Sequence, residues 1–331
     1  MPNLLNIINT AVSARALLLD ERHETAVRLF NGFAEGCPEL VIDLYGRTLL
    51  LHNYADPPEA GEALLAAVQS HWLAQWPWLE AVLVKHRHGA TAEAKRGLLT
   101  HGAASGRWVR EHGIRYALEL QMNRDASFYL DTRLLRRWLI DEMAGLRVLN
   151  TFAYTGSLGV AAVAGGATQV IQLDLNKQFL NVAKTSYTLN GFPIRKAEFV
   201  AADFWPALTK LNRTGEQFDC VLLDPPFFAT TSHGTVDLAS NVGRLINKIR
   251  PLVRDNGRIV AINNALFVSG EAYTAALQAL CADGYLTLEG HIPVPEDCTG
   301  YPHTRHTAPI TDPTPFNHST KIAILRVRKR G

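Results

Sequence analysis

The chain has 331 residues, of which 47% are hydrophobic, with a formal net charge of +2 and a pI near 8.3. A chain of this length buries about three quarters of its unfolded surface, which indicates a folded protein of one or two domains. A charge so close to neutral excludes a protein that holds nucleic acid by overall positive charge, so a polynucleotide partner would be held by local patches.

Composition also bears on the compartment in which the protein works. The four cysteines lie far apart and form no Cys-x-x-Cys pair, so we expect a reducing compartment, no disulfide framework and no metal site. The N-terminus lacks the early positive charge and the cleavage site of a signal peptide, and no uncharged apolar run reaches the roughly 18 residues that span a bilayer. The sequence therefore predicts a cytoplasmic protein without a membrane contact.

Residues 1–120 predict an N-terminal helix and then a small α+β domain. Apolar residues at helical spacing indicate an amphipathic helix over residues 1–21. Over residues 22–120, short β-rich runs alternate with turn signals, and Tyr45-Gly46-Arg47 is typical of a tight hairpin turn. The predicted elements are strands at 26–30, 40–45, 48–52 and 81–85 and a helix at about 59–72.

Residues 121–331 predict the main domain. From residue 146 onward, apolar strands alternate regularly with helical stretches, which is the pattern of a doubly wound, mostly parallel α/β sheet. Ligands of such sheets bind beyond the carboxyl ends of the strands. The predicted strands are 148–152, 170–174, 198–201, 220–223, 258–263 and 321–327, and residues 303–318, rich in Pro, Thr and His, predict an irregular loop.

The loop after the first strand of this domain is built from small residues. Residues 150–159, Asn-Thr-Phe-Ala-Tyr-Thr-Gly-Ser-Leu-Gly, lead into a helix, and their backbone amides can approach a ligand closely. The loop lacks the Gly-x-Gly-x-x-Gly spacing that seats a pyrophosphate, so a cofactor without phosphates fits it better. The alternative is a packing loop with two glycines.

Acids follow the next two strands. Asp174 ends the second strand, about 20 residues past the loop, where a carboxylate can accept hydrogen bonds from both hydroxyls of a ribose. Asp203 follows the third strand and is placed to meet an adenine edge. The alternative for each is a helix N-cap, because strand-to-helix loops favour Asp for that reason.

The strongest motif, Asp224-Pro225-Pro226-Phe227, closes the fourth strand. A buried strand that runs into this sequence gives a rigid rim with a carboxylate, a carbonyl and a ring in fixed relation. A flipped base could stack on Phe227 while its edge nitrogen bonds Asp224 or the Pro225 carbonyl. The alternative is a proline-braced turn with a core phenylalanine.

Together these motifs resemble those of class I S-adenosylmethionine-dependent methyltransferases. Phe128-Tyr129-Leu130-Asp131-Thr132-Arg133 and residues 150–156 resemble, more narrowly, the Rlm-type bacterial enzymes that methylate large-subunit ribosomal RNA, and residues 26–29 and 41–46 are similar to their small domain. The resemblance implies a Rossmann-like methyltransferase sheet in residues 121–331, S-adenosylmethionine as cofactor, and ribosomal RNA as partner, with residues 22–120 a candidate RNA contact. The cofactor residues that it implies are Phe128, Asp131, Arg133, Asn150, Phe152, Tyr154, Thr155, Gly156, Asp174, Asp203 and Asp224.

Departures from that family bear on the target atom. The resembling enzymes commonly carry an N-terminal PUA domain, where only a short helix precedes the small domain here, and their Lys-Thr-Gly is replaced by Asp125-Ala126-Ser127. Members that make 5-methylcytosine use a cysteine after the fifth strand, because a thiolate must first add to the ring. No cysteine stands there, and Cys220 is expected to be a small hydrophobe in a buried strand. A ring or exocyclic nitrogen is therefore the predicted acceptor.

Two adjacent asparagines, Asn263 and Asn264, stand at the end of that strand. They resemble the family branch that methylates guanine at nitrogen 7 and are candidate substrate contacts together with Phe227, although paired asparagines are also ordinary turn formers. Lys85-His86-Arg87-His88, Lys95-Arg96 and the tail 326–330 are candidate phosphate contacts, with solvated surface as the alternative.

Other functions remain open at this point. The same fold could methylate a small molecule or a protein, or could bind a nucleotide or RNA without catalysis. An intact Asp224 motif argues against the non-catalytic reading. A nicotinamide dehydrogenase is disfavoured because the pyrophosphate glycines are missing.

Overall fold

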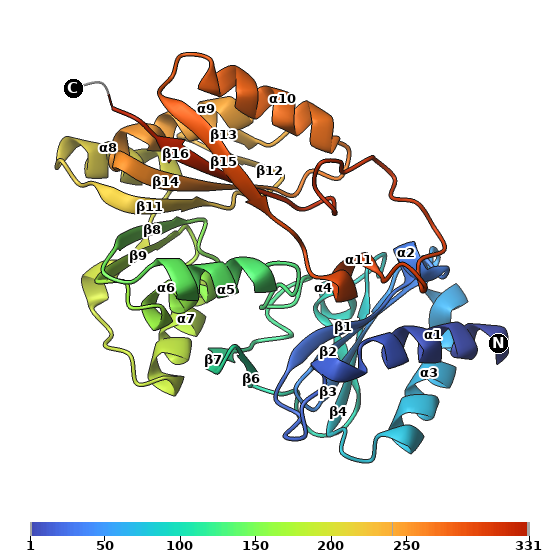
Figure 1. Ribbon diagram of the computed structural model, residues 1–331. Coiled ribbons are helices and arrows are strands. Elements are labelled where there is room, and N and C mark those ends of the chain that lie inside the picture. Colours follow the sequence, from blue (N-terminus) through green and yellow to red (C-terminus); the bar gives the residue numbers. More distant parts are fainter. Residues whose placement is uncertain (1, 240, 330–331) are drawn as a thin grey trace. The chain divides into compact units, whose positions relative to one another are not determined.

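The computed structural model describes residues 2–239 and 241–329 (Figure 1). The chain divides into two compact units, Met1–Asp131 with Pro295–Ala308, and Thr132–Val294 with Pro309–Gly331. Residues 121–131 and 295–308, which the sequence analysis placed in the larger domain, thus belong to the first unit. Within the described residues, no helix combines the length and the apolar character needed to cross a bilayer.

The first unit is built on a five-stranded sheet in the order β1-β2-β3-β4-β5. Neighbouring strands are antiparallel except β3 and β4, which are parallel. The predicted hairpin turn is confirmed: Tyr45 pairs with Thr48, and Gly46 takes a φ of +61° that glycine adopts without steric penalty. The strands are β1 (Ala26–Asn31), β2 (Leu40–Tyr45), β3 (Thr48–Asn53), β4 (Ala81–His86) and β5 (Leu98–His101), and a separate hairpin is formed by β6 (Trp108–Glu111) and β7 (Ile114–Ala117).

Helices cover this sheet with apolar side chains. Ile8 of α1 and Val68 of α3 pack on strand residues such as Leu29 and Leu51. The helix predicted over residues 1–21 ends at Ala14, because Arg15 turns inward and forms a fully buried ion pair with Glu35. The helices are α1 (Pro2–Ala14), α2 (Gly32–Glu35), α3 (Glu62–Gln75), α4 (Ala92–Arg96) and α11 (Glu296–Thr299), with 3-10 turns at Ala16–Leu18 and Pro58–Gly61.

Residues 295–308, the return segment, complete the first unit from far along the chain. Asn31 donates from Nδ2 to the Cys298 carbonyl at 2.7 Å, and the Arg28 amide donates to Asp297 Oδ2 at 3.1 Å. Arg15 donates to the Asp297 carbonyl at 2.8 Å, so the return segment also supplies an acceptor for the buried ion pair. The return segment is therefore part of the hydrogen-bonded interior of the first unit.

The second unit contains a seven-stranded sheet in the order β10-β9-β8-β11-β14-β16-β15. The pairs from β10 to β14 are parallel, and β16 pairs antiparallel with both β14 and β15. The predicted, mostly parallel α/β sheet is confirmed. Among its described strands only β16 runs against the others, because β15, which is antiparallel to β16, runs in the same direction as β14. The strands are β8 (Arg147–Thr151), β9 (Gln169–Asp174), β10 (Phe199–Ala201), β11 (Phe218–Leu223), β14 (Val253–Asn263), β15 (Leu286–Ile292) and β16 (Lys321–Val327).

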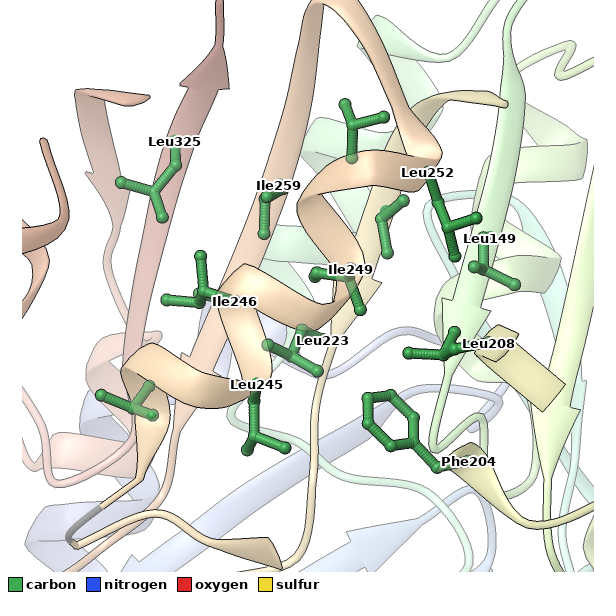
Figure 2. Close-up of a cluster of buried hydrophobic side chains, with 14 of the residues drawn as sticks. Leu149, Phe204, Leu208, Leu223, Leu245, Ile246, Ile249, Leu252, Ile259 and Leu325 are labelled. Carbon is green, nitrogen blue, oxygen red and sulfur yellow. The ribbon is translucent and has the colours of Figure 1, made fainter. Parts of the chain in front are cut away.

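Helices lie on both faces of this sheet, as Figure 1 shows. Alternate strand residues point to opposite faces, so Cys220 and Leu222 meet α5 and α6 while Val221 and Leu223 meet α8, α9 and α10. Figure 2 shows the core on the α8, α9 and α10 side of the sheet, where residues of α8 and α9 lie beside Leu149, Leu223, Ile259 and Leu325. The helices are α5 (Arg133–Glu142), α6 (Ser157–Ala164), α7 (Lys177–Leu189), α8 (Phe204–Arg213), α9 (Val242–Ile249) and α10 (Gly270–Cys281), with 3-10 turns at Lys196–Glu198 and Arg250–Leu252.

A short hairpin that the sequence analysis missed is inserted between β11 and α9. Its strands are β12 (Phe228–Thr231) and β13 (Gly234–Asp237), which pair antiparallel. The hairpin begins directly after the Asp-Pro-Pro-Phe motif, so it extends the carboxyl edge of the sheet. Residues 303–318 contain no helix or strand, in agreement with the predicted loop.

Candidate functional site

The loop after β8 is held in a strained conformation. Phe152 and Tyr154 have φ values of +54° and +51°, a region that side-chain-bearing residues rarely adopt. The Ala153 amide donates to the Leu173 carbonyl at 2.9 Å, and the Tyr154 amide donates to Asp174 Oδ2 at 2.8 Å. Strain of this kind persists where the surroundings fix it and is concentrated at functional sites, so the loop is a preformed wall at the strand edge.

Two buried side-chain amides, those of Asn150 and Gln172, hold the loop after β8 in place. Asn150 donates from Nδ2 to Gln172 Oε1 at 2.8 Å, and Gln172 donates from Nε2 to the Gly156 carbonyl at 3.3 Å. Both side chains are essentially inaccessible to solvent, at 1% and 0% exposure. Asn150, predicted to contact the cofactor, thus lies under the loop and positions it. Sequence reasoning missed Gln172, although an amide within the apolar run 170–173 was a signal.

Gly156 is required by packing as well as by backbone conformation. Its φ is +75°, and a Cβ there would lie 2.5 Å from the Cβ of Ala183 and 3.1 Å from Gln172 Nε2. This supports the packing alternative for the glycine itself. A cofactor contact through its backbone stays a prediction, as does one through Thr155, whose side chain is buried.

Asp174 ends β9 and ties two loops together. Its Oδ1 accepts from the Asn176 amide and its Oδ2 from the Tyr154 amide, both at 2.8 Å. Each carboxylate oxygen has a second lone pair, so the group can still accept from two hydroxyls. Burial raises the pKa of Asp174, while the two amides oppose that shift. Leu175, which sequence reasoning missed, follows with 65% of its surface exposed and offers an apolar face beside the acid.

Asp203 lies after β10 and caps α8. Its Oδ1 accepts from the Trp205 amide at 2.9 Å, so the N-cap alternative is confirmed. Its Oδ2 lies 3.8 Å from Nδ1 of His233 at the tip of the β12–β13 hairpin. The ring of Phe152 stacks on Phe204 with centroids 4.6 Å apart, which links the strained loop to the start of α8. The contact of Asp203 with adenine stays a prediction.

The Asp-Pro-Pro-Phe motif lies on the same sheet edge, after β11. Pro225 is buried, whereas Phe227 and Phe228 are 46% and 60% exposed. The alternative of a core phenylalanine is therefore wrong. The Phe227 carbonyl accepts from the Leu238 amide at 3.0 Å, so the backbone is fixed while the ring stays accessible.

The two asparagines after β14 have different environments. Asn264 is exposed and donates from Nδ2 to the Pro225 carbonyl at 3.5 Å, which brings it beside the Asp224 motif. Asn263 is fully buried, donating to the Leu238 carbonyl at 3.3 Å and accepting from the Ala265 amide at 2.9 Å. Asn263 was predicted to contact the substrate, but its place in the structure is that of a positioning residue.

A buried lysine that sequence reasoning missed supports this turn. Lys321 of β16 donates from Nζ to the Ala265 carbonyl at 3.1 Å and to the Ser319 carbonyl at 2.5 Å. Burial lowers the pKa of Lys321 to about 8. Beyond the turn, Leu266 and Phe267 are 41% and 75% exposed, so this side of the edge carries an apolar rim.

Three predicted cofactor residues precede β8. Phe128 and Asp131 belong to the first unit, where Phe128 is buried and its carbonyl accepts from the Tyr45 hydroxyl at 2.9 Å. Arg133 is the first residue of α5 in the second unit. The contacts of these residues with a cofactor stay predictions.

The basic runs proposed from sequence are largely engaged within the protein. Lys85 is fully buried and donates to the Asn123 and Asp125 carbonyls, both at 2.9 Å, so its prediction as a phosphate contact is wrong. Burial lowers the pKa of Lys85 to about 8. In the tail, Arg326 pairs with Glu289, and Arg330 lies outside the described residues.

The side chains at this edge suit a nucleoside cofactor without phosphates. The carboxylates of Asp174 and Asp203, at the ends of β9 and β10, can accept hydrogen bonds, and the exposed side chain of Leu175 lies next to Asp174 in the chain. The loop after β8 has no phosphate-binding glycine spacing. Burial raises the pKa of Cys220 to about 12, which rules out a thiolate there at neutral pH. In the described part of the chain, no group of three His, Cys, Asp or Glu side chains is arranged to hold a metal ion.

Comparison with known proteins agrees with this chemistry. A family profile described as S-adenosylmethionine-dependent methyltransferase matches residues 28–276. "Ribosomal RNA large subunit methyltransferase I" of Serratia proteamaculans is 33% identical over 208 residues, 61% of this chain and 51% of that protein. The protein of the same name from Photobacterium profundum is 32% identical over 230 residues, 67% of this chain and 56% of that protein. The chain spans about half the length of the curated relatives it matches.

A solved structure agrees over a longer stretch. The crystal structure of a protein assigned as a methyltransferase, complexed with SAH, superposes with a TM-score of 0.85 at 21% identity, covering 98% of this chain and 81% of that one. That likeness shows the fold. The family match, the fold and the strand-edge acids lead to one conclusion: the chain belongs to the S-adenosylmethionine-dependent methyltransferases and uses S-adenosylmethionine as its cofactor.

Proposed function

We propose that the protein transfers a methyl group from S-adenosylmethionine to a base of ribosomal RNA, at a nitrogen atom, in the cytoplasm. The observation that carries the proposal is the exposed ring of Phe227, in the segment that begins with Asp224 directly after the buried strand β11. Asn264 donates to the carbonyl of Pro225 in the same segment. The names of the curated relatives support ribosomal RNA as the acceptor.

The residues proposed to contact the cofactor bind it and orient it. In the proposal, Asp174 accepts from the ribose hydroxyls, Asp203 from the adenine amine, and the backbone of the 152–156 loop holds the methionine part. Phe128, Asp131 and Arg133 are proposed as further cofactor contacts. When bound, the cofactor supplies an electrophilic methyl group on a sulfonium. Because the electrophile comes ready-made, the contribution of the protein is placement and exclusion of water.

On the acceptor side, Phe227 stacks on the base and the Asp224 carboxylate holds its edge. Stacking on an aromatic ring contributes about 1–3 kcal/mol per base, enough to keep a base that has left its helix. A nitrogen acceptor already has a lone pair, or gains one when its proton moves to an acceptor such as Asp224. Carbon 5 of cytosine needs a thiolate first, and Cys220 is a buried thiol inside β11.

The test is methyl transfer followed by product identification. The protein is incubated with isotopically labelled S-adenosylmethionine and with RNA, protein and small-molecule fractions from cells lacking it, and labelled nucleosides are identified by mass spectrometry. We expect label in large-subunit RNA, on a nitrogen, and none with Asp224→Ala. Label confined to proteins or small molecules would refute the RNA acceptor, and 5-methylcytosine would refute the nitrogen assignment.

A further inference from the structure

A basic groove lies between α8 and α9 in the second unit. It has a volume of about 780 Å³, and no acidic side chain is among the described residues that line it. Lys210 and Arg213 of α8 face Arg244 and Lys248 of α9 across the groove, and we refer to these four residues as the basic groove. All four are exposed. Four cations in one concavity stand out in a chain whose net charge is only +2.

The four groove cations differ from several other arginines of the second unit, which are neutralised by acidic partners. In the second unit, Arg147 pairs with Glu216, Arg250 with Asp283, and Arg254 with Asp219, at 2.5–3.2 Å. None of the four groove residues forms an ion pair with any residue in the ranges 2–239 and 241–329. Their positive potential therefore adds up in the groove, where it favours an anionic ligand with several charges.

The groove is built on fixed side chains. Trp205, which is 8% exposed, forms part of its wall, and the Arg244 guanidinium lies over the Trp205 ring at 4.8 Å. Gly234 of the hairpin packs so closely on that ring that a Cβ would lie 2.5 Å from Trp205 Nε1. The arrangement of α8, α9 and the hairpin is thus set by packing before any ligand arrives.

The hairpin also connects the groove to the sheet edge. His233 at its tip lines the groove and lies 3.8 Å from Asp203, and β12 at its start follows Phe227 directly. The four residues of β12 span roughly 13 Å at 3.3 Å per residue. A polyanion lying in the groove would therefore run close to the exposed ring that we assign to the acceptor base.

We propose that the basic groove binds the sugar–phosphate backbone of the RNA next to the target nucleotide. This rests on the proposed function, because it takes RNA as the acceptor. Lysine and arginine contacts to phosphate position an RNA without reading its sequence. The groove positions the strand, while the Asp224 motif and Asn264 select the base.

The experiment compares two matched double variants. Lys210→Gln with Lys248→Gln removes two groove charges. Lys184→Gln with Lys196→Gln removes two lysine charges from α7 and the turn that follows α7, elsewhere in the same unit. Binding of ribosomal RNA is measured between 50 and 200 mM salt, cofactor binding by calorimetry, and folding by thermal unfolding.

The groove variant is expected to bind RNA about 25-fold more weakly at 0.1 M salt, with a salt slope smaller by about 1.4, because two fewer counterions are released from a single strand. Cofactor affinity and unfolding temperature stay those of the parent, and the α7 variant binds RNA as the parent does. Equal RNA binding and slope in both variants would overturn the groove assignment alone. A parent protein that binds and methylates no RNA would overturn the proposed function and the groove together.

Discussion

The two halves of the sheet edge in the second unit are built differently. After β9 and β10, the acids are already engaged: Asp174 accepts from two backbone amides and Asp203 caps a helix. After β11 and β14, the prominent side chains are Phe227 and Phe267, which are 46% and 75% exposed. The difference indicates that the half assigned to the cofactor is preformed, while the half where we propose that the acceptor binds presents accessible rings.

This contrast predicts that substitutions in the two halves affect different steps. Asp224→Ala should lower turnover roughly 10²–10⁴-fold, the range of a lost acid–base group, and leave cofactor affinity unchanged. Single-turnover kinetics and calorimetry measure the two quantities separately. Asp224→Asn keeps the shape without the charge and should be equally impaired. Unchanged turnover in either variant would remove Asp224 from the acceptor site.

On the other half, Asp174→Ala should act through binding. Two charge-assisted hydrogen bonds to loop amides are lost, each worth about 1.5–3 kcal/mol, so cofactor affinity is expected to fall at least about 100-fold. Calorimetric titration checks this, with Asp174→Asn as the variant that retains one acceptor oxygen. Tight cofactor binding by Asp174→Ala would contradict the idea of a preformed half.

A smaller effect is expected from the exposed ring. Phe227→Ala should raise the KM for RNA about 5–150-fold, which corresponds to about 1–3 kcal/mol of stacking, while Phe227→Tyr keeps the ring and should behave as the parent. Phe228→Ala, at the neighbouring and more exposed position, is the control. If both alanine variants raise KM equally, the effect belongs to the exposed apolar surface after β11 in general and the specific role of Phe227 is lost.

The smallest expected effect concerns the buried support of the half proposed for the acceptor. The folded pKa of Lys321, about 8, lies below its unfolded value of 10.5, so between these pH values the unfolded chain binds the extra proton. Stability from this group should therefore rise with pH across that window, by about 1 kcal/mol once the full shift is discounted for solvent screening. Measured from pH 7 to 10.5, the unfolding temperature of the parent should rise relative to that of Lys321→Met. Parallel curves would show that Lys321 stays charged.

Sequence alone predicted most of the long strands and the strand-edge acids because both follow local rules, whereas the four-residue strands β5, β6 and β7 were missed. Apolar runs of fixed length predict buried parallel strands, and Asp174, Asp203 and Asp224 follow from where those strands end. The β12–β13 hairpin was missed because its strands are only four residues long and half exposed. Strand β15 was missed because exposed residues alternate along it and its pairing with β16 has a bulge at Glu289.

Other features depend on contacts between residues far apart in sequence. The burial of Lys85 follows from carbonyls some 40 residues away, and the role of Lys321 from a turn 56 residues earlier. A lysine in a β-rich run has no local mark that separates an exposed cation from a buried one. Similarly, the pairing of Asn264 with Pro225 arises only because β11 and β14 are neighbours in the sheet.

The return segment has a consequence for synthesis of the chain. The Asp297 carbonyl that accepts from Arg15 is made 282 residues after it, and the Thr304 hydroxyl that donates to Glu35 is made 269 residues after it. During translation, the nascent first unit must wait with an unfinished interior while residues 132–294 emerge from the ribosome and fold. A ribosome stalled before codon 295 would therefore present a first unit that proteases cut more readily than the finished protein.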